Sequence, residues 1–249
     1  QYEERGVIEQ ILDLNLEQKQ AIFNYLVWNA KPEIKYYLYD FFYDNCSSRL
    51  RDVLDTTLAE SAIKFPLMQR EGKPTFRNMI DEYLIFHPWG DLGIDLGLGP
   101  PCDKVVSSSE YVFLPYELMR AYRGATLDDK PLVKQTRTLL NHPEWEVKWS
   151  VLDPIPLMWI IAGILLSLSA VGYRRHRLWI GIDLFYLFLT GAVGILVFFL
   201  WFITDHTGTM HNFNLLWAWP THWLILPFLG NANIRRYYWL IYGGMLILT

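Results

Sequence analysis

Two long apolar runs constrain the fold of this chain more than any other feature of its sequence. Residues 154–173 carry no charged side chain, and residues 178–203 carry only Asp183. A helix of about 20 residues crosses the ~30 Å hydrocarbon core of a bilayer. Both runs are long enough, so the sequence predicts a mainly α-helical membrane protein.

Two further apolar runs follow. Residues 215–230 are interrupted by Pro220 and Pro227, and a final run begins at residue 237 and is cut off at the last residue, 249. We therefore expect a transmembrane helical bundle over residues 154–249. Its four spans are predicted at about 154–173, 178–203, 215–230 and 237–249, with the last one truncated.

Basic loops orient these spans. Arg174, Arg175 and Arg177 lie between the first two runs, and Arg235 and Arg236 precede the last. Short Lys/Arg-rich loops stay on the cytoplasmic side of a membrane. Both loops fall on the same side, which places residues 1–153 on the outer face.

The charge balance bears on the partner. The chain has 22 basic and 26 acidic side chains, of which only five basic and two acidic ones follow residue 153. The remaining 17 basic and 24 acidic side chains make residues 1–153 net negative. Binding to nucleic acid needs a basic surface, so we expect no nucleic-acid partner.

Polar groups in the membrane half allow two interpretations each. Asp183 is either a functional intramembrane acid or a carboxylate that reaches water or a loop arginine. Residues 205–214, with His206 and His211, form either a polar connection or a headgroup-level site facing the outer half. A carboxylate and two histidines are too few ligands for a firm metal site, and we expect no metal and no cofactor.

The outer half contains two helix starts. Asn15 with Gln18 predicts a capping box and a helix to about Asn29. The aromatic residues 36–43 favour an extended strand or a buried segment. Asn45 then predicts an N-cap, which places Cys46 in the first turn of the next helix.

That position suits a nucleophile. The partial positive charge of a helix N-terminus favours the thiolate, which is the reactive form. Its free N–H groups can also hold the oxyanion of a tetrahedral intermediate. The alternatives are a buried structural Cys46 or a disulfide with Cys102, the only other cysteine. The Gly- and Pro-rich residues 86–101 lack phosphate-loop spacing, and we expect them to form an ordered loop.

The string Asn45-Cys46-Ser47-Ser48-Arg49-Leu50-Arg51-Asp52 resembles the Asn-Cys-(Ser/Ala)-(Thr/Ser)-Arg-x-Arg-Asp signature of the Lnb family, lipoprotein N-acyltransferases of Bacteroides-type bacteria. Residues 10–16, 88–99 and 214–217 also resemble segments of that family, and the order of an outer domain followed by several spans is similar.

The resemblance implies a partial α+β, NlpC/papain-like periplasmic domain over residues 1–153, and a place in the bacterial inner membrane. It implies that Cys46 attacks a phospholipid ester and passes the acyl chain to the α-amine of a lipoprotein's N-terminal cysteine. The bilayer, the phospholipid donor and the lipoprotein would be the partners.

The resemblance also assigns supporting roles. Arg49 or Arg51 would contact a phosphate or carbonyl, Asp52 would pair with them, and Asn45 would support Cys46. The family's partner histidine lies in an upstream Gly-His segment. This chain contains no Gly-His pair, so the general base is expected outside it, as in a fragment. Within the chain, His87 and His142 are the histidines of the outer half, and the alternative for each is an ordinary surface histidine.

Two alternative functions remain open at the level of sequence. One is a periplasmic thiol hydrolase, with water in place of the amine. The other is a non-catalytic subunit of an envelope membrane complex, which a disulfide between Cys46 and Cys102 would favour.

Overall fold

The computed structural model describes residues 6–58, 63–141, 146–177 and 179–248. The chain divides into two compact units. The first unit comprises residues 1–76 and 104–145, and the second comprises residues 77–103 and 146–249. Residues 77–103 thus belong with the membrane-spanning part, although the sequence groups them with the outer half.

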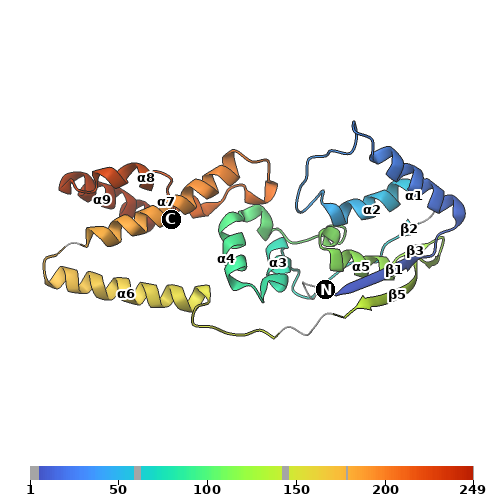
Figure 1. The fold of residues 1–249 in the computed structure, drawn as a ribbon, viewed down its shortest axis with the longest axis horizontal. Helices are drawn as coiled ribbons and strands as arrows, with labels where there is room; N and C mark the ends of the chain where they lie inside the picture. The colour runs from blue at the N-terminus through green and yellow to red at the C-terminus, as the bar shows by residue number, and fades with distance from the viewer. Residues whose placement is uncertain (1–5, 59–62, 142–145, 178, 249) are drawn as a thin grey trace. The chain divides into compact units, whose positions relative to one another are not determined.

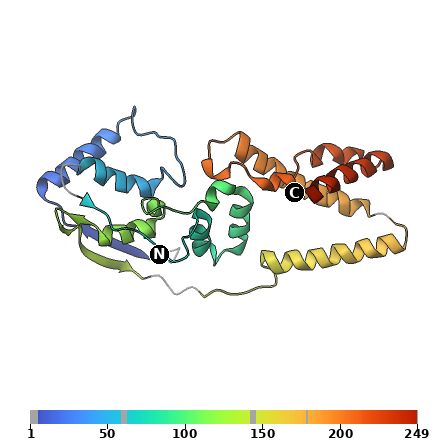
Figure 2. The ribbon, with the colours of Figure 1, turned by 180° about the vertical axis from the view of Figure 1, so that it is seen from behind.

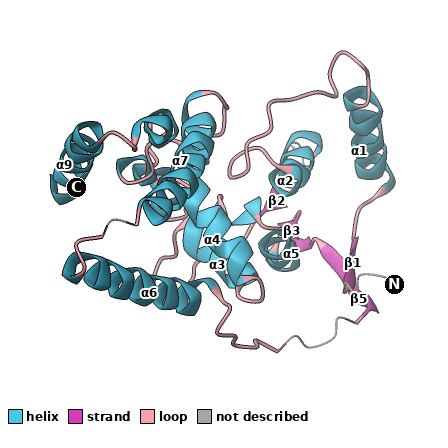
Figure 3. Ribbon diagram, turned by 60° about the vertical axis from the view of Figure 1, so that its left-hand side comes forward, coloured by secondary structure: helices cyan, strands magenta, loops and turns pink. Residues whose placement is uncertain are grey.

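The first unit is an α+β structure built from short elements (Figure 1). Its strands form two small antiparallel sheets, β1 with β5 and β2-β3-β4 (Figure 3). In the first sheet, Glu9 lies opposite Arg137. The elements are β1 (Val7–Leu12), α1 (Leu16–Asn29), α2 (Cys46–Thr57), β2 (Ile63–Lys64), η2 (Tyr111–Phe113), α5 (Pro115–Gly124), β3 (Thr126–Leu127), β4 (Lys130–Pro131) and β5 (Val133–Leu140).

Both helix starts predicted from the sequence are confirmed. Asn15 caps α1 in a capping box with Gln18, and Asn45 caps α2 in the same way with Ser48. Helix α2 buries Leu54 and Leu58 in a cluster with Leu127, Leu132 and Ala125. Burial of these apolar side chains packs α2 against β3, which contains Leu127.

Residues 36–43 do not form a strand. They run as a loop, and among the described residues a bridge between Asp40 and Asp44 is their one strand-like pairing. The Oδ1 atom of Asp40 accepts hydrogen bonds from the backbone N–H groups of Phe42 and Tyr43, which closes a turn in place of an extended segment. Phe42 is buried with Phe76 and Phe113, while its neighbours in the loop are exposed.

The second unit is helical. Two of its helices, α6 and α7, are long and apolar enough to cross a membrane. Figure 2 shows them joined end to end by a short connection. The elements are α3 (Phe76–Leu84, which begins at the boundary between the units), α4 (Pro88–Gly97), η1 (Pro100–Asp103), α6 (Pro154–Arg174), α7 (Ile180–Phe202), η3 (Thr207–Thr209), η4 (Phe213–Leu216), α8 (His222–Ile225), η5 (Leu226–Phe228) and α9 (Ala232–Leu248).

Residues 215–230, where the sequence predicts a third span, are divided among η4, α8 and η5. Pro220 and Pro227 account for the breaks, because proline cannot donate the backbone hydrogen bonds of a continuous helix. The broken segment packs closely on α7. A Cβ atom at Gly194 would lie 2.2 Å from the carbonyl oxygen of Ala218.

Residues 88–97 form helix α4, where the sequence predicts an ordered loop. Pro88 at the first helical turn favours this start, because its missing N–H needs no partner there. The end of α4 is held by the connection after α7. Asn212 donates from Nδ2 to the carbonyls of Leu96 and Gly97, at 2.8 and 3.0 Å. This contact explains why residues 77–103 group with the second unit.

Candidate functional site

The site is built around the N-terminus of α2. Asn45 is buried and extended, and its Oδ1 atom accepts hydrogen bonds from the backbone N–H groups of Ser47 and Ser48, at 2.8 and 2.9 Å. The hydroxyl of Ser48 accepts from the N–H of Asn45 at 2.8 Å. Together these bonds satisfy most of the first turn.

Cys46 is the first residue of α2 and its side chain is exposed. The sequence predicts free N–H groups at this end of the helix. In the structure the N–H groups of Ser47 and Ser48 donate to Asn45, so those two groups are not free to bind an oxyanion. The backbone N–H of Cys46 itself has no hydrogen-bond partner among the described residues. An oxyanion formed at the thiol would therefore meet the N–H of the same residue.

Asn45 also anchors this helix end to the rest of the first unit. Its Nδ2 group donates to the carbonyl of Phe41 at 2.7 Å and to that of Phe113 at 2.8 Å. All the hydrogen-bonding capacity of a buried amide is thereby used. Asn45 is consequently held by hydrogen bonds to its own helix, to Phe41 and to Phe113.

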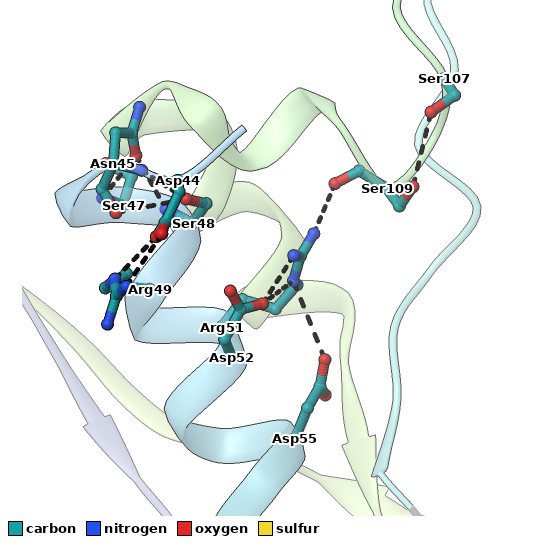
Figure 4. A network of polar contacts seen from close by, with 10 residues as sticks. All are labelled: Asp44, Asn45, Ser47, Ser48, Arg49, Arg51, Asp52, Asp55, Ser107 and Ser109. Atoms are coloured by element: carbon teal, nitrogen blue, oxygen red, sulfur yellow. Dashed lines mark hydrogen bonds and ion pairs between the residues drawn. The ribbon is translucent and has the colours of Figure 1, made fainter. Parts of the chain in front are cut away.

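Two arginines of α2 make different contacts (Figure 4). Arg49 forms a two-pronged ion pair with Asp44, at 2.6 and 2.8 Å, and its guanidinium lies 3.6 Å from the ring centre of Tyr37. Arg51 bonds Asp52 and the carbonyl of Ser109 instead. The acids beside Arg51 are thus Asp52 and, at 3.8 Å, Asp55, whereas the acid beside Arg49 is Asp44.

A small cavity of about 120 Å³ opens beside Arg51. Aromatic and polar side chains line it together: Phe42, Tyr43, Ser48, Arg51, Ser109, Glu110, Val112 and Phe113. Burial acts to raise the pKa of Glu110, but hydrogen bonds from Lys104 and Ser107 outweigh it and hold that pKa below its usual value. The cavity is therefore lined by the ionised carboxylate of Glu110 as well as by the guanidinium of Arg51.

The sequence pattern assigns no role to Tyr39. Burial raises the pKa of Tyr39, and the negative charge of a Cys46 thiolate raises it further. Its only sequence signal is its place seven residues before Cys46.

No histidine occurs within residues 6–58, 63–76 and 104–141, the described part of the first unit. His87 precedes α4, and His206 and His211 lie in the connection after α7, all in the second unit. The ring of His211 packs against Trp201. His142 falls outside the described residues.

Both cysteines are free thiols. Cys102 is buried in the second unit, where its S–H donates to the carbonyl of Gly208 at 3.1 Å. The structure therefore contains no disulfide between Cys46 and Cys102.

The second unit also gathers polar side chains. Carboxylates of Asp81, Asp91 and Asp95 lie within 4.8 Å of one another, and Arg77 pairs with Asp95. Asp183 lines a cavity of about 480 Å³ together with residues at the facing ends of α6 and α7.

A fully buried histidine, His222, gives no signal in the sequence pattern. It hydrogen-bonds the hydroxyl of Tyr238 within the broken segment and α9. Tyr242 donates to the carbonyl of Trp217 at 2.6 Å in the same cluster. These bonds satisfy polar groups inside an apolar bundle.

Comparison with known protein families gives two matches. Residues 1–81 match the Lnb N-terminal periplasmic domain, and residues 146–249 match the Lnb transmembrane domain. Comparisons with curated proteins and with solved structures give no match. The two matches carry the periplasmic motif with Cys46 and the spanning helices in the expected order, and so the chain belongs to the Lnb family, as a membrane protein with a periplasmic N-terminal domain.

Proposed function

We propose that this protein is a lipoprotein N-acyltransferase whose nucleophile is Cys46, acting at the outer leaflet of the bacterial inner membrane. One observation carries the proposal. Cys46 is an exposed, free thiol at the first position of a helix that Asn45 caps.

The first step is attack of the Cys46 thiolate on the ester carbonyl of a phospholipid. A sulfur–carbon bond forms, the tetrahedral oxyanion meets the N–H of Cys46, and the ester carbon–oxygen bond breaks. The lysophospholipid alkoxide takes up a proton and leaves. The product is an acyl thioester on Cys46. A general base outside the described residues of the first unit would take the proton of the Cys46 thiol and then, in its protonated form, donate it to the leaving alkoxide.

In the second step the free α-amine of a lipoprotein's N-terminal cysteine attacks the thioester carbonyl. An amide bond forms, the carbon–sulfur bond breaks, and the amine loses one proton. The thiolate of Cys46 is regenerated. An amine is a better nucleophile than water at this thioester, which favours transfer over hydrolysis.

The spanning helices support a lipid substrate. A wall-directed hydrolase needs no more than an anchor, whereas residues 146–249 of this chain match a whole transmembrane domain that includes the spanning helices α6 and α7. Cys46 and Cys102 are free thiols. A disulfide between them would have favoured a non-catalytic subunit.

The experiment is acyl loading of the purified protein in nanodiscs that contain a phospholipid with a radiolabelled acyl chain. The wild type should acquire label that hydroxylamine releases, and Cys46→Ala should acquire none. Cys102→Ser is the matched control, because a hydroxyl can keep the bond to Gly208, and it should load like the wild type.

Three outcomes would count against the proposal. Label on the Cys46→Ala protein would place the nucleophile elsewhere. Loading followed by release of free fatty acid in the presence of a lipidated peptide amine would indicate a thiol hydrolase. No loading in a folded wild type would favour a non-catalytic role.

A further inference from the structure

The loop that leads into Cys46 exposes apolar and aromatic side chains. We call residues 36–43 the aromatic loop. Tyr36 is 79% exposed and Leu38 is 73% exposed, and Tyr37, Tyr39, Phe41 and Tyr43 are also exposed. Large apolar surface of this kind is costly in water and marks a surface that contacts something else.

The exposure does not come from a loosely held segment. Phe42, in the middle of the loop, is 4% exposed and packs against Phe76 and Phe113. Asp40 accepts two backbone N–H bonds within the loop, and Asn45 donates to the carbonyl of Phe41 at its end. These contacts hold the aromatic loop in place on the first unit.

Cationic side chains lie over the rings of the aromatic loop. The ammonium group of Lys35 is 4.8 Å from the ring centre of Tyr36, and the guanidinium of Arg49 is 3.6 Å from that of Tyr37. Tyrosines with one apolar body and one wet end, flanked by cations, are the side chains that collect at membrane–water interfaces.

The spanning helices of the same chain keep the first unit near a bilayer. Strand β5 ends at Leu140 and the spanning helix α6 begins at Pro154. The intervening residues, 141–153, reach at most about 45 Å when fully extended, at ~3.5 Å per residue. The first unit is therefore tethered close to a membrane surface, where an aromatic loop can reach lipid.

We propose that the aromatic loop lies in the interfacial layer of the same bilayer that α6 and α7 span, with Leu38 directed into the lipid. Cys46 follows the loop by three residues, so the thiol would be held at the depth of phospholipid ester carbonyls. The proposal deepens the proposed function by naming the surface through which the acyl donor reaches Cys46.

The location can be measured without any acyl transfer. In the full chain carrying Cys46→Ser, a spin label is attached at Leu38→Cys and the protein is placed in nanodiscs of phosphatidylethanolamine and phosphatidylglycerol. Cys102 is buried and does not compete for the label. The matched control is Leu67→Cys, since Leu67 is also 73% exposed and lies in the first unit.

Collision rates with oxygen and with a water-soluble nickel chelate give the result. We expect the label at position 38 to collide more with oxygen and less with nickel than the label at position 67. Equal, water-like values at both positions would overturn the proposal. Shielding of position 38 from both reagents would also overturn it, because a protein surface would then cover the loop.

A second measurement links the location to the chemistry. Leu38→Asp should slow acyl loading of Cys46 from nanodisc lipid by about tenfold, because a carboxylate resists the interface, while Leu67→Asp should load normally. Alkylation of Cys46 by iodoacetamide should be equally fast in both, which shows an intact site. Normal loading of Leu38→Asp would contradict the proposal.

The two hypotheses fail in different ways. If wild-type protein takes up no acyl chain but position 38 reports lipid contact, the proposed function fails and the membrane contact stands. If loading occurs and position 38 reports water, only the membrane contact fails.

Discussion

The side-chain amide of Asn45 donates a 2.8 Å hydrogen bond to the backbone carbonyl of Phe113, which lies 68 residues further along the chain. The same side chain caps α2 through its oxygen. The position of Cys46 is therefore fixed by a long-range contact as well as by a local one, and the predictions below begin from it.

Asn45→Asp separates these two roles. The carboxylate can still cap α2, but it cannot donate to the carbonyls of Phe41 and Phe113, and its charge would lie buried against them. We expect a loss of about 2–3 kcal/mol in the free energy of unfolding of the first unit, measured by denaturant titration in detergent. Asn15→Asp is the control. Asn15 caps α1 in the same capping-box geometry but is exposed, so that change should be nearly neutral. Equal losses for the two variants would contradict the anchoring role.

Phe76→Ala tests the aromatic cluster beneath the aromatic loop. Phe76 is fully buried, and its ring centre lies 4.6 Å from that of Phe42 and 5.2 Å from that of Phe113. Removing the ring leaves a cavity, and we expect a loss of about 3–5 kcal/mol. Phe23→Ala, at a 61% exposed position in α1, should cost about 0.5 kcal/mol or less. Thermal unfolding monitored by fluorescence gives both values.

Tyr37 and Arg49 should be energetically coupled. In a double-mutant cycle of Tyr37→Ala and Arg49→Ala, we expect a coupling energy of about 0.5–1 kcal/mol, because the contact is partly exposed and screened by solvent. The cycle is measured by denaturant titration. Additive effects of the two changes would mean that the stacking contributes nothing to stability.

Gly194→Ala should disrupt the packing of the broken segment on α7. The added Cβ would lie 2.2 Å from the backbone oxygen of Ala218, and backbone cannot move aside cheaply. We expect a loss of at least about 2 kcal/mol, seen as a lower melting temperature in detergent. Gly181→Ala lies in the same helix with nothing within 4 Å of its Cβ. That control should be neutral or slightly stabilising, because alanine is the better helix former.

Glu110 should make the first unit sensitive to acid. Its pKa is held below the usual value in the folded state by the bonds from Lys104 and Ser107, against the effect of burial. The stability it contributes is therefore fully present above the unfolded pKa of about 4.3 and is lost as the pH falls through the lower, folded pKa.

Melting temperatures of the wild type and Glu110→Gln should differ most near neutral pH and converge as the pH falls below about 4. Lys104→Gln removes the bond from the ammonium group to the Glu110 carboxylate and should show part of the same effect. A constant difference at every pH would show that the carboxylate's charge is not involved.

The sequence is sufficient for the features that depend on local chemistry. The capping box at Asn15 and the N-cap at Asn45 follow from residue type and spacing, and the two spanning helices follow from length and lack of charge. The place of Cys46 at the start of α2 follows from the cap alone. These features need no knowledge of distant residues.

Features that depend on distant contacts were not predictable. The aromatic residues 36–43 have strand-like composition, but Asp40 closes a turn and no partner strand pairs with them. Residues 88–97 are rich in glycine, yet form α4 because Asn212 binds its C-terminal carbonyls.

The contact between Asn212 and Leu96 joins residues 116 positions apart, and both α6 and α7 are synthesised in between. At a translation rate of about 5–20 residues per second, Leu96 and Gly97 emerge on the order of ten seconds before their partner. During that interval the carbonyls of Leu96 and Gly97 lack the bonds that Asn212 makes to them in the folded structure. The native end of α4 is therefore completed only after the second spanning helix has been synthesised.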